Sequence, residues 1–133
     1  MKIAIMGAGG LGGFFGGKLA QAGHDVWFIA RGQQLAALKA SGLRLQGPDP
    51  EIVISHPNAT EMPAEIGAVD LVLFCVKLYD IEPAAALIKP ILTDATAVIS
   101  VLNGIDGPQR LATALETGTV FSGAARISAK IKA

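Results

Sequence analysis

A glycine-rich segment near the start of the chain has the spacing of a phosphate-binding turn. Gly7, Gly9 and Gly12 satisfy the pattern G-x-G-x-x-G, after a short β-rich run and before a helical pattern. In such a turn the first glycine permits the tight bend, the second lets a pyrophosphate approach the backbone, and the third lets the helix pack closely on the strand. Free N–H groups at the helix start then attract the phosphates. The residues expected to bind the cofactor here are Gly7, Ala8, Gly9, Gly10, Leu11 and Gly12.

Arg31 stands where a site for NAD usually carries an acid. An acid near the end of the second strand would hold the ribose 2′-hydroxyl, but this chain has Arg31, nineteen residues after Gly12. A carboxylate would repel a 2′-phosphate, whereas an arginine pairs with it. Such a contact, of roughly 1.5–3 kcal/mol, favours NADP over NAD by about 10- to 100-fold. Asp25 begins the second strand rather than ending it, so NADP(H) is the predicted cofactor.

Two further polar residues follow buried strands directly. Lys77 comes after "DLVLFCV", and Asn103 comes after "AVISVL". Burying an ammonium group is costly, so a lysine at this position makes sense if it faces an anionic ligand. An asparagine can both donate and accept near a carbonyl or carboxamide. Because ligands of open α/β sheets gather at the carboxyl ends of strands, we expect both residues to line a cofactor and substrate site.

The other reactive side chains have no partners at useful spacing. His24 and His56 have no companions at metal-ligand distances, so we interpret both as structural and expect no metal. Cys75 is the single cysteine, which rules out an intrachain disulfide and fits a small buried side chain within a strand. Tyr79 is interpreted as a packing residue. No Ser-His-Asp set or carboxylate pair stands out, so the residues themselves indicate no catalytic group.

Strand and helix patterns alternate along the whole chain, which positions these residues at strand ends. Strands are expected at 2–6, 25–30, 70–76, 97–102 and 119–123, and helices at 11–22, 33–41, 81–89 and 108–116. Gly23 and Gly42 are expected to end the first two helices, Asp80 to cap the third and Pro90 to close it. The fold class is therefore α/β, a Rossmann-type doubly wound and mainly parallel sheet with helices on both faces.

Two segments are less clear. The turn-prone "GPDP" separates two weak strands, expected at 43–45 and 52–54, and residues 124–133 remain open between irregular chain and an edge strand. Connections are short, so a single dinucleotide-binding domain over residues 1–133 is expected.

Composition excludes several classes of function. The chain has 51% hydrophobic and 17% charged residues and a formal net charge of zero, without a cluster of lysines and arginines. Nucleic acid and an acidic membrane surface are therefore not expected partners. No apolar run approaches the roughly 20 residues of a membrane span. The N-terminus is not interpreted as a signal peptide because glycines and Lys18 interrupt its apolar stretch, and we expect a cytoplasmic protein.

The first helix contains an unusual number of glycines. Gly12, Gly13, Gly16 and Gly17 lie within it, and each costs about 1 kcal/mol relative to alanine. Gly16 lies one turn beyond Gly12, so we expect it to allow close packing on the sheet or the cofactor. Gly13 and Gly17 have no role that the sequence predicts.

With these residues identified, the sequence resembles the N-terminal half of the ketopantoate reductase (2-dehydropantoate 2-reductase) family. The resemblance covers essentially all 133 residues and rests on "GAGGLGG", "ARG", "SGLRL", "VKLYD" and "LNGID". It implies NADPH-dependent reduction of a 2-oxo acid to a 2-hydroxy acid, with pantoate, in pantothenate and coenzyme A synthesis, as the typical product. It also implies that Arg31 holds the 2′-phosphate, that Lys77 and Asn103 lie near nicotinamide and substrate, and that backbone near Ala129 touches the cofactor.

Length is the important departure from that family. Members are roughly twice as long and carry a C-terminal helical domain, which supplies a general-acid lysine and most substrate contacts. Lys130 and Lys132 lie too early in this chain to match that lysine. The resemblance therefore implies that this chain holds no catalytic residue and is inactive alone, and we expect self-association through the face that the missing domain would cover.

Two alternatives remain open at this point. One is the cofactor domain of another NADP-dependent hydroxyacid or glycerol-phosphate dehydrogenase, against which the "VK" and "NG" pairs argue. The other is a non-catalytic nucleotide-sensing domain like those that regulate potassium channels. Such domains resemble NAD binders, with an acid where Arg31 stands here.

Overall fold

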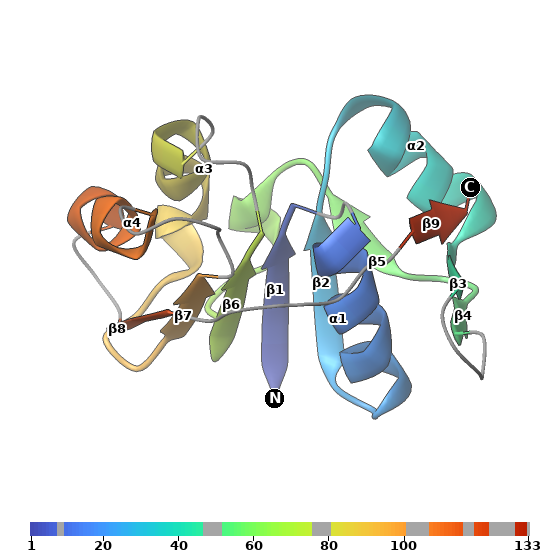
Figure 1. Ribbon diagram of the computed structural model, residues 1–133, viewed down its shortest axis with the longest axis horizontal. Helices are drawn as coiled ribbons and strands as arrows, with labels where there is room; N and C mark the ends of the chain where they lie inside the picture. Colours follow the sequence, from blue (N-terminus) through green and yellow to red (C-terminus); the bar gives the residue numbers. More distant parts are fainter. Residues whose placement is uncertain are drawn as a thin grey trace.

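The computed structural model describes residues 1–7, 10–46, 52–75, 81–100, 107–115, 119–122 and 130–132. Among these residues, six parallel strands form one sheet in the order β5-β2-β1-β6-β7-β8 (Figure 1). The strands are β1 (Lys2–Met6), β2 (Asp25–Ile29), β5 (Asn58–Thr60), β6 (Leu71–Phe74), β7 (Ala97–Ser100) and β8 (Thr119–Ser122). The chain moves outward from β1 in one direction and then returns to continue from β6 in the other. This order confirms the predicted doubly wound sheet and places its topological switch point between β1 and β6.

Helices cover both faces of this sheet. The helices are α1 (Gly10–Gln21), α2 (Gly32–Ser41), α3 (Ile81–Ile88) and α4 (Gly107–Leu115), and the short 3₁₀ turns are η1 (Pro63–Glu65) and η3 (Lys89–Ile91). Side chains of α1 and α2 pack with Ile5 and Phe28 in one core cluster. Those of α3 and α4 pack with Met6 and Phe74 in the other. We call these two faces of the sheet the α1 face and the α3 face.

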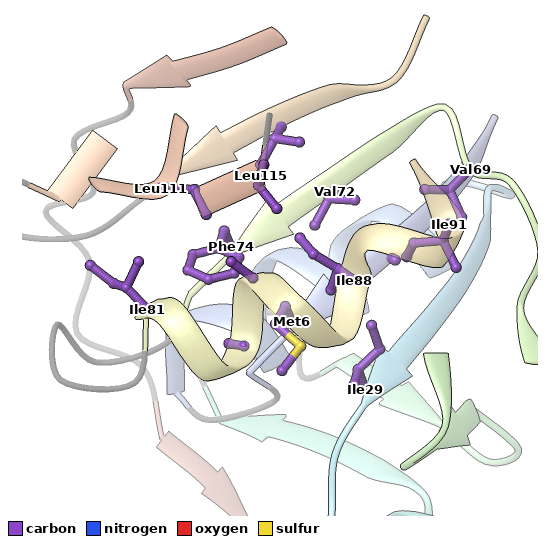
Figure 2. Packing of buried hydrophobic residues seen from close by; sticks show 14 of the residues in the cluster. Met6, Ile29, Val69, Val72, Phe74, Ile81, Ile88, Ile91, Leu111 and Leu115 are labelled. Atoms are coloured by element: carbon purple, nitrogen blue, oxygen red, sulfur yellow. The ribbon is translucent and has the colours of Figure 1, made fainter. Parts of the chain in front are cut away.

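The core of the α3 face is built from large aliphatic side chains. Figure 2 shows Ile81 and Ile88 of α3 directed toward the sheet, where Phe74 lies between α3 and the α4 residue Leu111. All four side chains are fully buried. Alternating strand residues supply the sheet side of both cores, which is why β1 and β2 read as continuous apolar runs.

The predicted helix ends are confirmed at two glycines. Gly23 has a φ of 99°, its N–H donates to the oxygen of Ala20 at 3.1 Å, and the N–H of His24 donates to the oxygen of Leu19 at 3.2 Å. This pair of bonds is the Schellman pattern that ends a helix. Gly42 ends α2 with a φ of 75° and donates its N–H to the oxygen of Leu38 at 3.0 Å.

A small antiparallel sheet packs on the outer side of α1. In the part of the chain that the structure describes, its strand order is β4-β3-β9, where the strands are β3 (Leu43–Gln46), β4 (Ile52–Ile54) and β9 (Lys130–Lys132). The two weak strands on either side of "GPDP" are thus confirmed. The edge-strand interpretation of residues 124–133 holds for β9, while 124–129 and 133 lie outside the described residues. Figure 1 shows this sheet beside α1 and α2, at the opposite end from α3 and α4.

Several element boundaries differ from the expectations. The sequence pattern missed β5, η1 and η3. The expected strand 70–76 is wrong at both ends, because β6 starts at Leu71 and stops at Phe74. The expected helix 81–89 ends at Ile88, and η3 continues the turn through Pro90, because proline is accepted in the first turn of a new helical segment. The expected cap Asp80 lies outside the described residues. None of the described helices is both long and apolar enough to cross a membrane.

Candidate functional site

The ends of β1 and β6 meet at the switch point, where open α/β sheets bind their ligands. Met6 is in register with Phe74, and the N–H of Cys75 donates to the oxygen of Met6 at 2.8 Å. Gly7 therefore emerges from β1 directly beside the end of β6.

The glycine turn has the backbone that its pattern predicts. Gly7 has a φ of 95°, a conformation that residues with a side chain rarely adopt. A Cβ atom on Gly12 would collide with the carbonyl oxygen of Gly7 and would lie 3.0 Å from Cγ2 of Ile5. A side chain at either position would thus disrupt the turn itself. This close return of the helix onto the turn is the geometry found in glycine turns that bind a pyrophosphate.

The helix α1 begins directly after this turn, so its N-terminus lies beside the turn. Gly10 and Leu11 form the first residues of α1, and Ala8 and Gly9 lie outside the described residues. The first N–H groups of a helix have no partner within it and carry partial positive charge. The first turn of α1 contains no acidic residue that would repel an anion. The described part of the segment therefore fits a phosphate group.

Gly16 holds α1 close to the sheet, which confirms the expectation for this residue. A Cβ atom there would collide with the ring of Phe28 and would lie 3.0 Å from Cγ1 of Ile5. Gly13 and Gly17 are also buried. The run of glycines thus lets α1 fit closely between the large sheet and the small one.

Arg31 lies on the same edge of the sheet as the glycine turn. β1 and β2 are parallel neighbours with Met6 in register with Ile29, and Arg31 follows Ile29 by two residues. Arg31 is exposed and takes an extended conformation, with a φ of −144° and a ψ of 166°, at the N-cap of α2. A positively charged side chain therefore follows the strand that lies next to the glycine turn.

Asp25 lies at the other end of β2. It is in register with Lys2, and its N–H donates to the oxygen of Met1 at 3.1 Å. Its carboxylate accepts a long hydrogen bond of 3.5 Å from Nδ2 of Asn58. The length of β2 separates this carboxylate from the ligand edge, as the sequence indicated.

The remaining predicted site residues are Lys77, Asn103 and Ala129, which lie outside the described residues, as does Tyr79. The strands before Lys77 and Asn103 are parallel neighbours, with Phe74 in register with Ser100. Phe74 and Ser100 therefore end their strands on the edge of the sheet that carries Gly7 and Arg31.

Cys75 differs in part from its interpretation as a strand residue. It lies one residue beyond β6, is partly buried, and packs at the edge of the core on the α1 face. Burial raises the pKa of its thiol from 9.0 to about 12, so the group stays protonated near neutral pH. The side chain packs there as a small apolar group. No group of three or more potential metal ligands is found among the described residues, which include His24 and His56.

Thr60 and Glu65 are residues near the site that sequence reasoning missed. Thr60 ends β5 beside β2, and its hydroxyl donates to Oε2 of Glu65 at 2.8 Å. β5 has only three residues and no apolar run, so nothing marked its end as part of the ligand edge. The usable signal was Pro63 followed by an acid, which is typical of the start of a helical turn.

The strand order and the glycine turn at its switch point define a Rossmann-type doubly wound domain. A family model described as ketopantoate reductase PanE/ApbA matches residues 3–133. The chain belongs to this family.

Individual relatives agree with this assignment. A 2-dehydropantoate 2-reductase of Mesorhizobium japonicum is 42% identical over 106 residues, which are 79% of this chain and 32% of the relative. A crystal structure of a PanE/ApbA family ketopantoate reductase from Ralstonia eutropha has a TM-score of 0.84 and 42% identity over 92% of this chain and 40% of its own. The chain thus spans about a third to two fifths of these relatives.

A second similar structure contains a bound cofactor. The ternary structure of D-mandelate dehydrogenase with NADH and anilino(oxo)acetate has a TM-score of 0.81 and 27% identity, over 93% of this chain and 40% of its own. The same fold therefore serves a dehydrogenase with a nicotinamide cofactor.

Proposed function

We propose that this chain binds NADP(H) as the cofactor domain of an oxidoreductase that reduces a 2-oxo acid, with ketopantoate as the substrate and pantothenate synthesis as the setting. The observation that carries the proposal is the exposed Arg31 at the end of β2, on the same sheet edge as the glycine turn. The turn and the α1 N-terminus would hold the pyrophosphate. The guanidinium would form a bidentate, charge-assisted contact with the 2′-phosphate.

The bound nicotinamide would supply a hydride to the ketone carbon of the substrate. The part of this chain is to hold and orient the dinucleotide, because hydride transfer needs the reacting atoms in close and fixed geometry. Lys77 and Asn103, which follow adjacent strands, are proposed to face the nicotinamide and the substrate carboxylate. The family resemblance assigns the general acid to a lysine in the C-terminal helical domain. We therefore propose that these 133 residues alone bind cofactor without efficient turnover.

Titration of the chain with NADPH and with NADH tests the cofactor. We expect NADPH to bind tighter by about 10- to 100-fold, and Arg31→Ala to remove that preference with little change for NADH. Lys39→Ala is the matched control, because it removes an exposed cation from the far end of α2. Tighter binding of NADH by the unaltered chain would contradict the proposal.

The proposed lack of turnover has a separate test. NADPH oxidation is followed in the presence of ketopantoate, with a full-length reductase of the family as the positive control. We expect a negligible rate from the 133-residue chain. Sustained turnover by the purified chain would show that a general acid lies within it.

A second candidate is favoured by the likeness to D-mandelate dehydrogenase, whose ternary structure contains NADH. On this alternative the chain serves another hydroxyacid dehydrogenase. A preference for NADH that survives Arg31→Ala would support it. Ketopantoate and an aromatic 2-oxo acid can then be compared as ligands of the cofactor complex.

A further inference from the structure

The end of β5 is joined to the residue that precedes Arg31. Thr60 is in register with Ile29, and the N–H of Ala30 donates to the oxygen of Thr60 at 3.0 Å. This bond continues the ladder between β2 and β5 by one step beyond β2. The conformation of the chain as it enters Arg31 therefore depends on where the end of β5 lies.

One hydroxyl group fixes the end of β5. Thr60 is only 6% exposed. Its Oγ1 accepts the N–H of Met62 at 3.0 Å and donates to Oε2 of Glu65 at 2.8 Å. Met62 is the N-cap of η1, so these two bonds close the turn from β5 into η1. Without the hydroxyl, the Met62 N–H and the Glu65 carboxylate would both lose this partner.

Thr60 and Arg31 also lie toward the same side of the sheet. Ile29 packs in the core of the α3 face, and side chains alternate along an extended chain. Arg31, two residues later and in extended conformation, emerges on that side, where Thr60 lies beside Ile29. β5 is short and ends the strand order, with β2 as its described neighbour. Such a strand frays readily unless its end is held by further bonds.

We propose that Thr60, with Glu65 as its acceptor, is a positioning residue for Arg31. By holding the end of β5, the Thr60 hydroxyl holds the Ala30 backbone and so orients the guanidinium toward the 2′-phosphate. Thr60 thereby contributes to the choice of NADPH over NADH without touching the dinucleotide. This inference rests on the proposed function, because it concerns the cofactor preference that Arg31 is proposed to create.

The test compares isosteric substitutions at two buried threonines. Thr60→Val keeps the shape and removes the hydroxyl, whereas Thr60→Ser keeps the hydroxyl. Thr96→Val is the matched control, since Thr96 is 1% exposed and its hydroxyl donates to the oxygen of Val69 at 2.7 Å. Thr96 precedes β7, so it lies at the opposite edge of the sheet from Arg31.

We expect Thr60→Val to weaken NADPH binding by about 3- to 10-fold and NADH binding by less than about twofold, as the loss of one hydrogen-bonded support implies. Thr60→Ser should restore the preference. Thr96→Val should leave the ratio of NADPH to NADH affinity unchanged, although it removes an equally buried hydrogen bond. Glu65→Ala, at an exposed position, should lower the ratio of NADPH to NADH affinity, as Thr60→Val does.

The Arg31→Ala background separates this inference from the proposed function. If Thr60 acts through Arg31, Thr60→Val causes no further loss of NADPH affinity in that background. An unchanged ratio in Arg31→Ala itself would overturn the proposed cofactor preference. Arg31→Ala could lose the preference for NADPH over NADH while Thr60→Val and Glu65→Ala keep it. That result would overturn only the role of Thr60. Equal losses for NADPH and NADH in Thr60→Val would do the same.

Discussion

The two faces of the large sheet are packed in opposite ways. On the α3 face, bulky residues such as Ile88 and Leu111 fill the space between helix and strand. On the α1 face, Gly12 and Gly16 remove side chains so that the helix backbone approaches Ile5 and Phe28. Dispersion and burial hold α3 and α1 alike. In addition, α1 brings its own backbone close to the end of a strand. The difference separates a face packed by bulky side chains from a face on which helix backbone approaches the sheet at the glycine turn.

The largest expected effect comes from the α3 face. Ile88→Ala removes a fully buried side chain and leaves a cavity, so the free energy of unfolding should fall by about 2–5 kcal/mol. NADPH affinity of the folded protein should not change. α3 begins after the end of β6 on the ligand edge, and Ile88 is its last residue, away from that edge. Urea unfolding and NADPH titration measure the two quantities.

The neighbouring Leu87 provides the control for Ile88→Ala. Leu87 lies on the same helix but is 45% exposed, so Leu87→Ala should cost less than about 0.5 kcal/mol. Similar losses at both positions would show that the α3 face does not pack as described.

Adding one methyl group to α1 should have an intermediate effect on stability and a specific effect on binding. Alanine is the better helix former by about 1 kcal/mol, so an unhindered glycine replacement would stabilise the protein. Instead, Gly12→Ala and Gly16→Ala should each destabilise by about 1–3 kcal/mol, because the new Cβ collides with a neighbour. Urea unfolding followed by circular dichroism shows whether each variant raises or lowers the free energy of unfolding.

The two glycine variants should differ in NADPH binding. Gly12→Ala clashes with the Gly7 backbone, which cannot rotate away, so it should abolish detectable binding. Gly16→Ala clashes with the Phe28 ring, one turn further from the phosphate turn, and should weaken binding less. Equal losses of affinity, or a gain in stability from either variant, would remove the distinction between turn and packing glycines.

The effect that is smallest at neutral pH concerns Cys75 at the edge of the α1 face. Its pKa is raised to about 12 by burial, while the unfolded thiol ionises near 9. Between these values the unfolded state loses a proton that the folded state keeps, so stability falls as the pH rises. The slope from this group is at most about 1.4 kcal/mol per pH unit.

Comparison with Cys75→Ala isolates that slope from the pH dependence of the rest of the protein. The difference in unfolding free energy between the two proteins should fall from pH 9 upward and be constant between pH 6 and 8. A thiol that reacts with iodoacetamide at pH 8 as fast in the folded as in the unfolded chain would contradict the buried position.

The sequence predicted those features that depend on local chain geometry. Gly7, Gly23 and Gly42 all have the positive φ that their motifs require, since only glycine adopts it without cost. The alternation of apolar runs with helical patterns predicted the parallel sheet, because strands covered on both faces have no polar side. The position of Arg31 just after β2 was predictable, because the apolar run "VWFI" shows where that strand ends.

One element with little local signal, and two contacts between distant segments, were missed. β5 consists of Asn58, Ala59 and Thr60, and it becomes a strand because β2 offers it unpaired backbone groups. β9 pairs with β3, although most of the sequence separates the two strands. No residue near either strand predicts this contact. The role of Gly16 likewise depends on Phe28, which reaches it only through the packing of β2 beside β1.

The sequence by itself determined the glycine turn and the charge that follows the second strand, because both depend on residue type and short spacing. Tertiary structure alone decided that Thr60 supports the chain entering Arg31, and that α1 lies between two sheets. Those relations come from strand order, which is set by the burial of the whole sheet rather than by any one segment.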